Sequence, residues 1–381
     1  MKVLFVTLFP LEDNTSVTIS NYGLLMGLRE LGHEVTILMP HYTSDDSRAC
    51  EYDLSDFTIE RIPGLSFAEC RQVKPLTILN RIRRKWHKEF DFLDFTAQML
   101  NAVKDVPVEG RYYDLILSTS DPKTSHVFVK KMIDSGLKYG RWIQHWGDPM
   151  NGDITRRSCY PDKFVQWYER RIIKYADKVI YVSPFTAETQ CDAYPDMEDK
   201  IDFIPLPCIV GDSKPISKGH HKGKKLRLAY MGDYSSSIRN IIPLYEACKQ
   251  MKDVELIIAG ISDLQLQSTD NITIFPRIPH SQAQVVEAQS DVSVSVCNLR
   301  GTQIPGKLYY SAAMQKHLLV LVDGDNPKAI RDYLLHFNRY TLADNKLDSI
   351  KSALNTLKSK PCDYVCPDEL QPINVVKKIL K

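Results

Sequence analysis

Residues 302–325, TQIPGKLYYSAAMQKHLLVLVDGD, combine residue types that suit phosphate binding. A rigid Pro305–Gly306 turn delivers Lys307 to the start of an amphipathic segment, and an aliphatic strand that ends in acids and glycine follows. A cation at a helix start stabilises the negative charge of a diphosphate leaving group. The pattern predicts that Lys307 faces a phosphate, and the alternative is an ordinary solvated lysine.

A second polar group, IQHWGDPMNGD (143–153), follows a predicted strand. Carboxylates accept paired hydrogen bonds from vicinal diols, so Asp148 and Asp153 are candidates to bind sugar hydroxyls, with Asn151 beside them. His145 at the strand end is a further candidate. The alternatives are a satisfied core histidine and an Asp-Pro pair that only makes a turn.

Metal and disulfide chemistry find little support in the sequence. The interpretation of the sequence requires neither a divalent metal nor a cofactor. The nine cysteines are odd in number and lack paired spacing, which fits a reducing compartment. Cys362 and Cys366 form a lone C-x3-C, whereas structural zinc needs four ligands.

Apolar runs alternate with segments of helical periodicity, which predicts an α/β fold with parallel sheets. In the first 40 residues a strand, a helix that ends at Gly32 and a second strand form a right-handed βαβ unit. The predicted strands are 2–9, 34–40, 114–120, 141–146, 178–183, 201–207, 226–232, 254–260, 271–276, 292–297 and 318–322, and the helices that follow the first βαβ unit are 123–134, 168–176, 241–251 and 281–289.

A chain of 381 residues is too long for one ordinary core, and one segment interrupts the alternation. Residues 211–225, GDSKPISKGHHKGKK, have almost nothing to bury and are typical of a linker. We therefore expect a Rossmann-like domain at 1–210, a second at 226–360, and an amphipathic tail helix within 361–381 that packs back on the first domain. Two such domains would face each other across a cleft, where ligands of these folds bind.

Four stretches resemble the retaining glycosyltransferases of GT-B fold, in particular the family 4-like, nucleotide-sugar-dependent ones. They are YGLLMGLRELGHEVTIL, ERRIIKYADKVIYVSPFTAET, LAYMGDYSSSIRNIIPLYEAC and IPGKLYYSAAMQKHLLVLV. With the strands between them, the resemblance covers about residues 1–340. The last stretch is similar to the donor motif P-S-K-x-x-E-Y of that family.

The resemblance implies roles for individual residues. The family's glycine pair falls on Thr15 and Ser16, a loop arginine on Asp233, and the paired glutamates on Thr302 and Tyr310. The implied catalytic residues are His145 and Asp148. Those implied at the donor diphosphate are Lys307, Arg239, Thr15, Ser16 and Gly232, and those at the donor sugar, ribose or base are Gly301, Thr302, Gln303, Ile304, Tyr310 and Ile278.

Charge and hydropathy bear on partners and location. A net charge of +2 and the lack of any known motif argue against a nucleic-acid partner. The N-terminal apolar run is too short for a signal peptide, and no run reaches the ~20 residues of a membrane span, so we expect a cytoplasmic protein. Residues 77–93 combine an apolar helical face with five basic residues. This pattern favours either peripheral contact with an anionic membrane or a core-packing helix with a solvated basic face.

The leading hypothesis is a glycosyltransferase that moves a sugar from a nucleotide-sugar to a glycan or lipid-linked acceptor, with retention, in surface polysaccharide biosynthesis. One alternative is a nucleotide-sugar epimerase of the same fold, for which no acid–base set is found. The other is a non-catalytic homologue that acts as a binding subunit or scaffold. The missing glutamates, Thr15–Ser16 and Asp233 support the scaffold, whereas Lys307, Arg239 and His145 argue against it.

Overall fold

The computed structural model of the chain describes residues 1–13, 15–42, 52–63, 93, 95–155, 160–209 and 225–381. The chain divides into two compact units, one formed by Met1–Leu206 with Pro372–Lys381 and the other by Pro207–Gln371. The first unit thus ends four residues before the predicted boundary at 210, and it includes the last ten residues of the tail. The predicted linker, apart from Lys225, and the predicted basic helix, apart from Leu93, lie outside the described residues.

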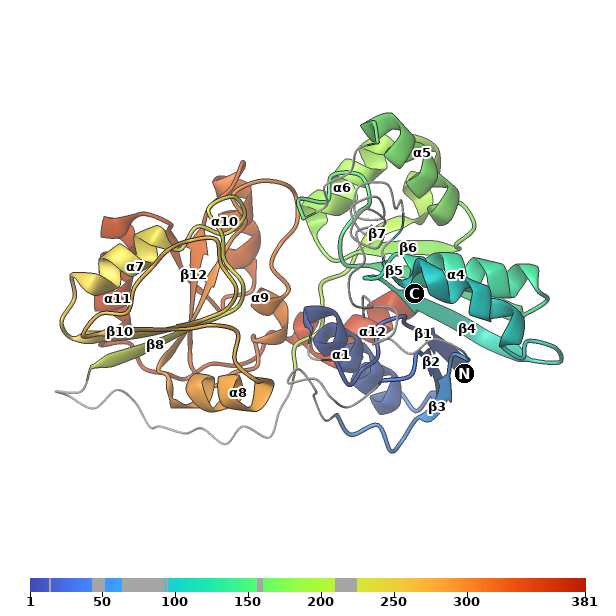
Figure 1. Cartoon of the computed structure of the whole chain (residues 1–381), viewed down its shortest axis with the longest axis horizontal. Coiled ribbons are helices and arrows are strands. Elements are labelled where there is room, and N and C mark those ends of the chain that lie inside the picture. Colours follow the sequence, from blue (N-terminus) through green and yellow to red (C-terminus); the bar gives the residue numbers. More distant parts are fainter. Residues whose placement is uncertain (14, 43–51, 64–92, 94, 156–159, 210–224) are drawn as a thin grey trace, which may run out of the picture. The chain divides into compact units, whose positions relative to one another are not determined.

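The first unit is built on a parallel sheet with the strand order β3-β2-β1-β4-β5-β6-β7 (Figure 1). Its order reverses between β1 and β4, which is the switch point at which ligands of such sheets bind. The strands are β1 (Lys2–Val6), β2 (Glu34–Met39), β3 (Thr58–Arg61), β4 (Tyr112–Thr119), β5 (Lys138–Trp146), β6 (Lys178–Tyr181) and β7 (Ile201–Phe203).

Helices cover both faces of this sheet. Alternate residues of each strand point to opposite faces, so each strand contributes to two cores. Leu4 and Val6 of β1 join one core with helix α4, whereas Val3 and Phe5 join another with helices α1 and α12. The helical segments of this unit are α1 (Ser16–Glu30), η1 (Phe95–Asp105), α4 (Thr124–Asp134), α5 (Asp162–Ile173), α6 (Pro184–Ala193), η2 (Pro195–Lys200) and α12 (Pro372–Leu380).

The tail helix α12 packs on α1, as Figure 1 shows for the red and blue helices. Val375, Val376 and Ile379 are fully buried in the core that α1 covers. Gly27 of α1 makes this close contact possible, because a Cβ atom there would collide with the backbone of Pro372. The end of the chain therefore completes the core of the N-terminal unit.

The second unit has a parallel sheet of order β10-β9-β8-β11-β12-β13. All residues of β11 and β12 are buried, as expected for central strands covered on both faces. The strands are β8 (Leu226–Met231), β9 (Val254–Ala259), β10 (Ile272–Phe275), β11 (Val292–Val296), β12 (His317–Val322) and β13 (Thr341–Asp344), and the helical segments are α7 (Ile242–Lys249), α8 (His280–Gln289), α9 (Lys307–Tyr310), α10 (Pro327–His336), α11 (Leu347–Leu357) and η3 (Asp368–Leu370).

Helix α9 is a single turn of four residues, shorter than the amphipathic segment predicted after Lys307. The buried guanidinium of Arg339 donates to the carbonyl oxygens of Ala312, Met314 and Lys316. These carbonyls therefore have a side-chain partner, and the helix does not continue through them. One turn lacks the aligned dipoles of a longer helix, so Lys307, rather than a helix start, supplies positive charge here.

Candidate active site

Lys307 reaches two acceptors at the carboxyl end of the second sheet. Its Nζ donates to Oε1 of Glu287 in α8 over 2.6 Å and to the carbonyl oxygen of Met231, the last residue of β8, over 3.2 Å. The side chains of Lys307 and Glu287 are 14% and 16% exposed, so solvent screens their ion pair only partly. The predicted phosphate-facing lysine thus has a carboxylate partner that the sequence did not indicate.

Tyr310 and Arg239 belong to the same group of residues. Burial and then the negative charge of Glu287 raise the pKa of the Tyr310 phenol, while the charge of Arg239 acts in the opposite direction. Arg239 donates from Nε to Oδ1 of Asn298 over 2.9 Å, and Asn298 donates to the carbonyl oxygen of Gln303 over 2.9 Å. Lys307 thus contacts Glu287 directly, and the charges of both Glu287 and Arg239 affect the pKa of the Tyr310 phenol.

The loop after β8 carries Asp233, paired with Arg277, at the position where the resembled family has an arginine. Asp233 follows Gly232 and pairs with Arg277, and its Oδ1 accepts a hydrogen bond of 2.9 Å from the amide of Ile261. Gly232 packs so closely on Gly260 that a Cβ atom at Gly260 would collide with its carbonyl. Arg277 precedes the half-buried Ile278 between β10 and α8. A cation thus reaches this loop from another segment of the chain.

The loop before α9 is more enclosed than its sequence suggests. Gly301 has a φ of +81° and donates its amide proton to Oδ2 of Asp325 over 3.0 Å, so this amide already has an acceptor. Gln303 and Ile304 are buried, and Thr302 is half-buried. These four residues, predicted to line the donor sugar and base, form the connection between Asn298 and Lys307.

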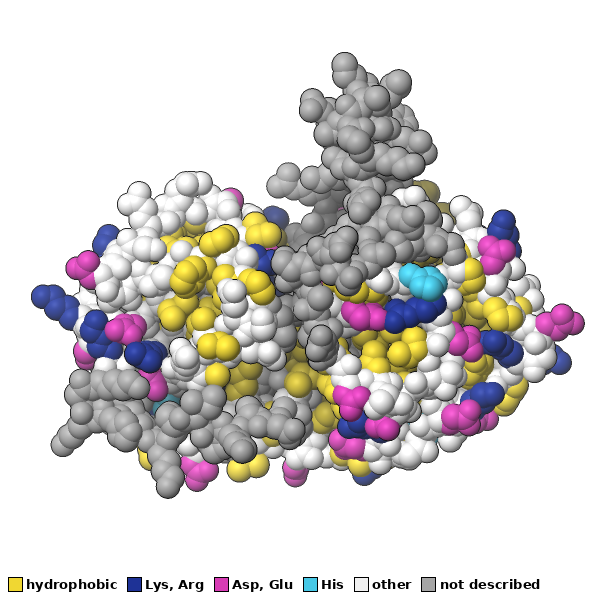
Figure 2. All heavy atoms as spheres, turned by 60° about the horizontal axis from the view of Figure 1, so that its bottom comes forward, with side chains coloured by type: hydrophobic (Ala, Val, Ile, Leu, Met, Phe, Trp, Pro, Cys, Tyr) yellow, Lys and Arg dark blue, Asp and Glu magenta, His cyan; other side chains and the backbone are white. Residues whose placement is uncertain are grey.

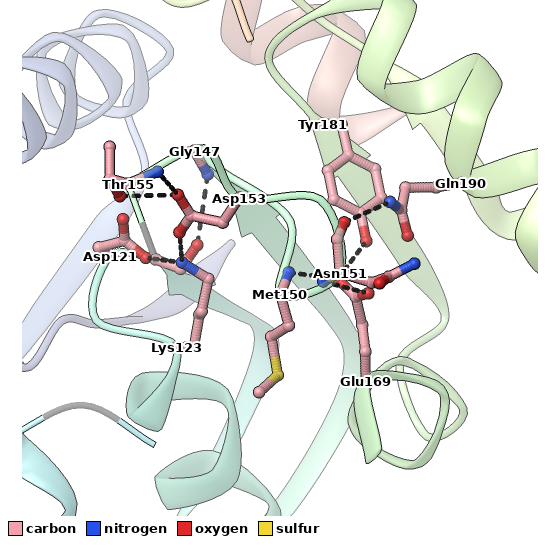
Figure 3. Close-up of polar contacts among 11 residues, drawn as sticks. Asp121, Lys123, Gly147, Met150, Asn151, Asp153, Thr155, Glu169, Tyr181 and Gln190 are labelled. Atoms are coloured by element: carbon pink, nitrogen blue, oxygen red, sulfur yellow. Dashed lines mark hydrogen bonds and ion pairs between the residues drawn. The ribbon is translucent and has the colours of Figure 1, made fainter. Parts of the chain in front are cut away.

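Lys123 lies at the centre of the polar group in the first unit (Figure 3). Its Nζ contacts Asp121 Oδ1 at 2.7 Å and Asp153 Oδ2 at 3.1 Å. Burial acts to lower the pKa of Lys123, but the charges of Asp121, Asp153 and Asp148 outweigh it and raise that pKa. The predicted sugar-binding residues Asp148 and Asp153 therefore lie around a buried cation near the carboxyl ends of β4 and β5.

The loop that carries Asp148 and Asp153 is fixed by Glu169 of α5. The carboxylate of Glu169 accepts hydrogen bonds from the amides of Met150 over 2.7 Å and Asn151 over 3.1 Å, and from the hydroxyl of Tyr194 over 2.9 Å. Glu169 is fully buried, and burial raises its pKa although these hydrogen bonds act to lower it. The shape of this loop thus depends on a residue of the following helix.

His145, the residue before Trp146 in β5, is 2% exposed, and neither of its ring nitrogens has a hydrogen-bond partner among the described residues. Burial lowers the pKa of His145 to about 4, so the ring is neutral at pH 7. The alternative prediction for His145 was a core histidine whose nitrogens are satisfied by hydrogen bonds, and no such bonds are present among the described residues.

Thr15 and Ser16 lie at the start of α1 in the first unit. Thr15 is its N-cap: its hydroxyl accepts a hydrogen bond from the amide of Thr18 over 3.2 Å, and the hydroxyl of Thr18 accepts one from the Thr15 amide over 3.0 Å. This reciprocal pair satisfies two amides at the helix start. The Thr15 hydroxyl predicted to contact a diphosphate thus has a structural role, whereas Ser16 is exposed.

Five residues of these groups are absent from the sequence prediction. Their contacts join segments far apart in the chain, such as Lys123 with Asp153 and Lys307 with Glu287. Only Glu169 could have been predicted from the sequence. It is an acidic residue on the apolar face of a helix, and a buried acid requires a partner. The five are Asp121, Lys123, Glu169, Arg277 and Glu287.

Other chemistry is sparse in the parts of the chain that the structure describes. Among these residues no group of three or more His, Cys, Asp or Glu is arranged to hold a metal ion. Cys362 lies against the carbonyl oxygen of Gln315, and Cys366 contacts the thiol of Cys208 at 3.2 Å. None of the described helices is long and apolar enough to cross a bilayer. On the face shown in Figure 2, acidic and basic side chains are interspersed.

Comparison with known proteins adds structural relatives. Sucrose-phosphate synthase from Thermosynechococcus elongatus matches 100% of this chain and 94% of its own, with a TM-score of 0.54 and 16% identity. Anabaena Alr3699/HepE, solved in complex with UDP and glucose, matches 100% and 94%, with a TM-score of 0.55 and 10% identity. The lipopolysaccharide outer core galactosyltransferase WaaB matches 100% and 99%, with a TM-score of 0.51 and 12% identity. The chain has the GT-B fold.

The predicted pair of Rossmann-like domains in a GT-B protein is thereby confirmed. No protein-family model and no curated protein sequence matches the chain. At identities of 10–16% the GT-B relatives establish the architecture, and activity has to be argued from the side chains.

Proposed function

We propose that the protein is a glycosyltransferase that takes its sugar from a nucleotide-sugar. The observation that carries the proposal is the group formed by Lys307, Glu287, Arg239 and Tyr310 at the carboxyl end of a Rossmann-like sheet. Ligands of such sheets bind at this end. A relative of the same fold, HepE, was solved with UDP and glucose, which supports a nucleotide-sugar donor.

In this proposal the second unit holds the donor. Lys307 has one N–H left beyond its two acceptors, and that N–H and the guanidinium of Arg239 neutralise the charge that develops on the leaving diphosphate. Arg277, held by Asp233, adds a cation at the loop that starts with Gly232. Thr302, Gln303 and Ile278 would line the sugar or the base.

The first unit binds the acceptor. The carboxylates of Asp148 and Asp153 accept hydrogen bonds from sugar hydroxyls, and the ion pair with Lys123 holds Asp153 in place and acts to lower its pKa. His145 is neutral at pH 7, so its ring offers one donor and one acceptor to a sugar hydroxyl near the reacting carbon. Glu169 acts as a positioning residue, because it holds the loop that carries both aspartates.

The finer assignments also belong to the proposal. They are transfer of a hexose with retention, no requirement for a divalent metal, and a glycan or lipid-linked acceptor in surface polysaccharide biosynthesis. The site of action would be the cytoplasm or the inner face of the membrane, with peripheral contact through residues 77–93. A relative of the same fold, the lipopolysaccharide galactosyltransferase, supports this choice of acceptor class.

The test is nucleotide binding by the full chain. UDP, GDP, ADP and CMP are titrated by calorimetry into the wild type, Lys307→Ala and the control Lys328→Ala, whose lysine is exposed on α10. One nucleoside diphosphate should bind the wild type and the control alike, and Lys307→Ala should weaken it by about tenfold or more, the usual effect of losing a charged hydrogen bond.

A non-catalytic scaffold is the second candidate, favoured by the carboxylate that already neutralises Lys307. No binding of any of the four nucleotides would select it and contradict the transferase. Nucleotide binding that Lys307→Ala and Lys328→Ala weaken equally would instead remove Lys307 from the donor site.

A further inference from the structure

Glu287 has spare hydrogen-bonding capacity within the predicted donor site. Its Oε1 is bound to Lys307 at 2.6 Å, whereas its Oε2 accepts no hydrogen bond from the described residues. The side chain is 16% exposed, so it is reachable from solvent while most of it is held by protein. An ionised carboxylate can accept about four hydrogen bonds, so most of this capacity is free for a ligand.

Tyr310 is a poor acceptor for the hydroxyls of a ligand. It stands where the resembled family has a carboxylate, but burial followed by the charge of Glu287 raises the pKa of its phenol, so the phenol is neutral. A neutral hydroxyl forms weaker hydrogen bonds than a carboxylate does. Tyr310 lies one helical turn after Lys307 in α9, and Lys307 is the residue that the carboxylate of Glu287 contacts.

We propose that Glu287 is the residue that binds the ribose hydroxyls of the nucleotide, in place of a carboxylate at position 310. This assignment rests on the proposed function, because it presumes a nucleotide in the second unit. The carboxylate reaches the site from α8, twenty positions before Lys307 in the chain. The donor site therefore keeps a ribose-binding acid and changes the element that supplies it.

The ion pair explains how one carboxylate serves this purpose. Lys307 fixes Oε1, and its Nζ is itself held by the carbonyl oxygen of Met231, so Oε2 is oriented before a ligand arrives. A preorganised acceptor loses less entropy on binding than a free side chain. A site built to accept from hydroxyl groups discriminates strongly against a ligand that lacks them.

The experiment compares a ribonucleotide with its 2′,3′-dideoxy counterpart. The probe is whichever of UDP, GDP or ADP binds the wild type, titrated into the wild type, Glu287→Gln, Glu287→Ala and Lys307→Ala. The wild type should prefer the ribonucleotide by about tenfold to a hundredfold, the range expected for hydrogen bonds to a charged group. Glu287→Ala should remove most of this preference, mainly by weakening the ribonucleotide. Lys307→Ala should weaken both ligands, because both carry the diphosphate, and should weaken the ribonucleotide somewhat more, because Glu287 loses the partner that orients it.

Glu255→Gln is the matched control. Glu255 also pairs with a cation, Arg227, but it lies near the amino end of β9, away from the carboxyl ends of the strands where the nucleotide is proposed to bind. The Glu255→Gln protein should prefer the ribonucleotide as strongly as the wild type does. If Glu287→Ala fails to fold, Glu287→Gln keeps the shape of the side chain and should still lose part of the preference. Unchanged preference in the Glu287 variants, or equal weakening of both ligands, overturns the ribose assignment while leaving the transferase proposal intact. No nucleotide binding by the wild type overturns the proposed function itself.

Discussion

At the scale of single residues, Lys123 is a buried cation of the candidate active site. Its side chain is 10% exposed and that of Asp153 is 5% exposed, so each ion depends on the other for the solvation it has lost. Lys130, on the following helix, makes an ion pair of similar length with Asp134, but that aspartate is 59% exposed. The two lysines therefore allow the same substitution to be compared in buried and exposed surroundings.

We expect Lys123→Met to lower the free energy of unfolding by about 3–5 kcal/mol, because it leaves a buried carboxylate without its cation. Lys130→Met should cost about 0.5 kcal/mol, as for an exposed i,i+4 pair. Urea unfolding at pH 7 measures both, and Lys123→Met with Asp153→Asn should recover part of the loss. Equal effects of the two single substitutions would contradict a buried ion pair.

The pH dependence of the stability lost in Lys123→Met follows from the directions in which the pKa values of Lys123 and Asp153 are shifted. The folded pKa of Lys123 is raised, so its contribution is complete below the ordinary lysine value and is lost only as the pH rises through the raised value. The folded pKa of Asp153 is lowered, so its contribution is complete above the ordinary aspartate value. The cost of Lys123→Met should therefore be constant from pH 6 to pH 9.

Individual residues also show what could be predicted from the sequence. His145, Asp148 and Lys307 are predicted from local signals, because they lie near the end of a strand, just after it, or after a Pro-Gly turn. Glu287 and Lys123 were not, because their roles arise from contacts between distant segments, and a single sequence does not encode which helix supplies a partner. Thr15 had a local signal, the T-x-x-T spacing of a cap, that competed with its predicted ligand role.

At the scale of elements, the buried strands were the most predictable. The predicted strands 226–232 and 254–260 correspond to β8 (Leu226–Met231) and β9 (Val254–Ala259), because continuous apolar runs mark strands covered on both faces. Helix α5 begins at Asp162, six residues before the predicted helix, since its first turns mix polar residues with the exposed aromatic Phe164 and Trp167 and carry little periodicity. Helix α9 ends at Tyr310, and Arg339, which is distant in the sequence, binds carbonyl oxygens of the segment that follows it.

The contact between α1 and α12 is the element-scale feature most open to test. Gly27→Ala places a Cβ on the carbonyl oxygen of Pro372 and 2.6 Å from Cγ2 of Val376. Overpacking of this kind should lower the free energy of unfolding by about 1–3 kcal/mol, measured by urea titration. Glu30→Ala, on an exposed turn of the same helix, should leave it within about 0.5 kcal/mol of the wild type. A Gly27→Ala protein as stable as Glu30→Ala would contradict close packing of the tail helix.

At the scale of the whole molecule, each unit has its own sheet and its own core. All four tryptophans, at positions 86, 142, 146 and 167, belong to the first unit, and Trp142 and Trp146 are fully buried there. Tryptophan fluorescence therefore reports the first unit alone. The residues proposed to bind the nucleotide belong to the second unit, so ligand stabilisation and fluorescence address different halves of the chain.

The last prediction uses this separation. At a nucleoside diphosphate concentration of about 100 times Kd, the second unit should gain about 2.7 kcal/mol of stability by mass action. Hydrogen exchange at the buried amides of β8 and β11 should slow by the corresponding factor of about 100. The urea midpoint seen by tryptophan fluorescence should stay within error, because each unit has its own core and the ligand is expected to bind the second one. Lys307→Ala, which binds about tenfold more weakly or worse, should reduce the slowing to a factor of about 10 or less at the same ligand concentration. An equal shift of the fluorescence midpoint would instead show that the two units unfold as one, or that the first unit binds the nucleotide.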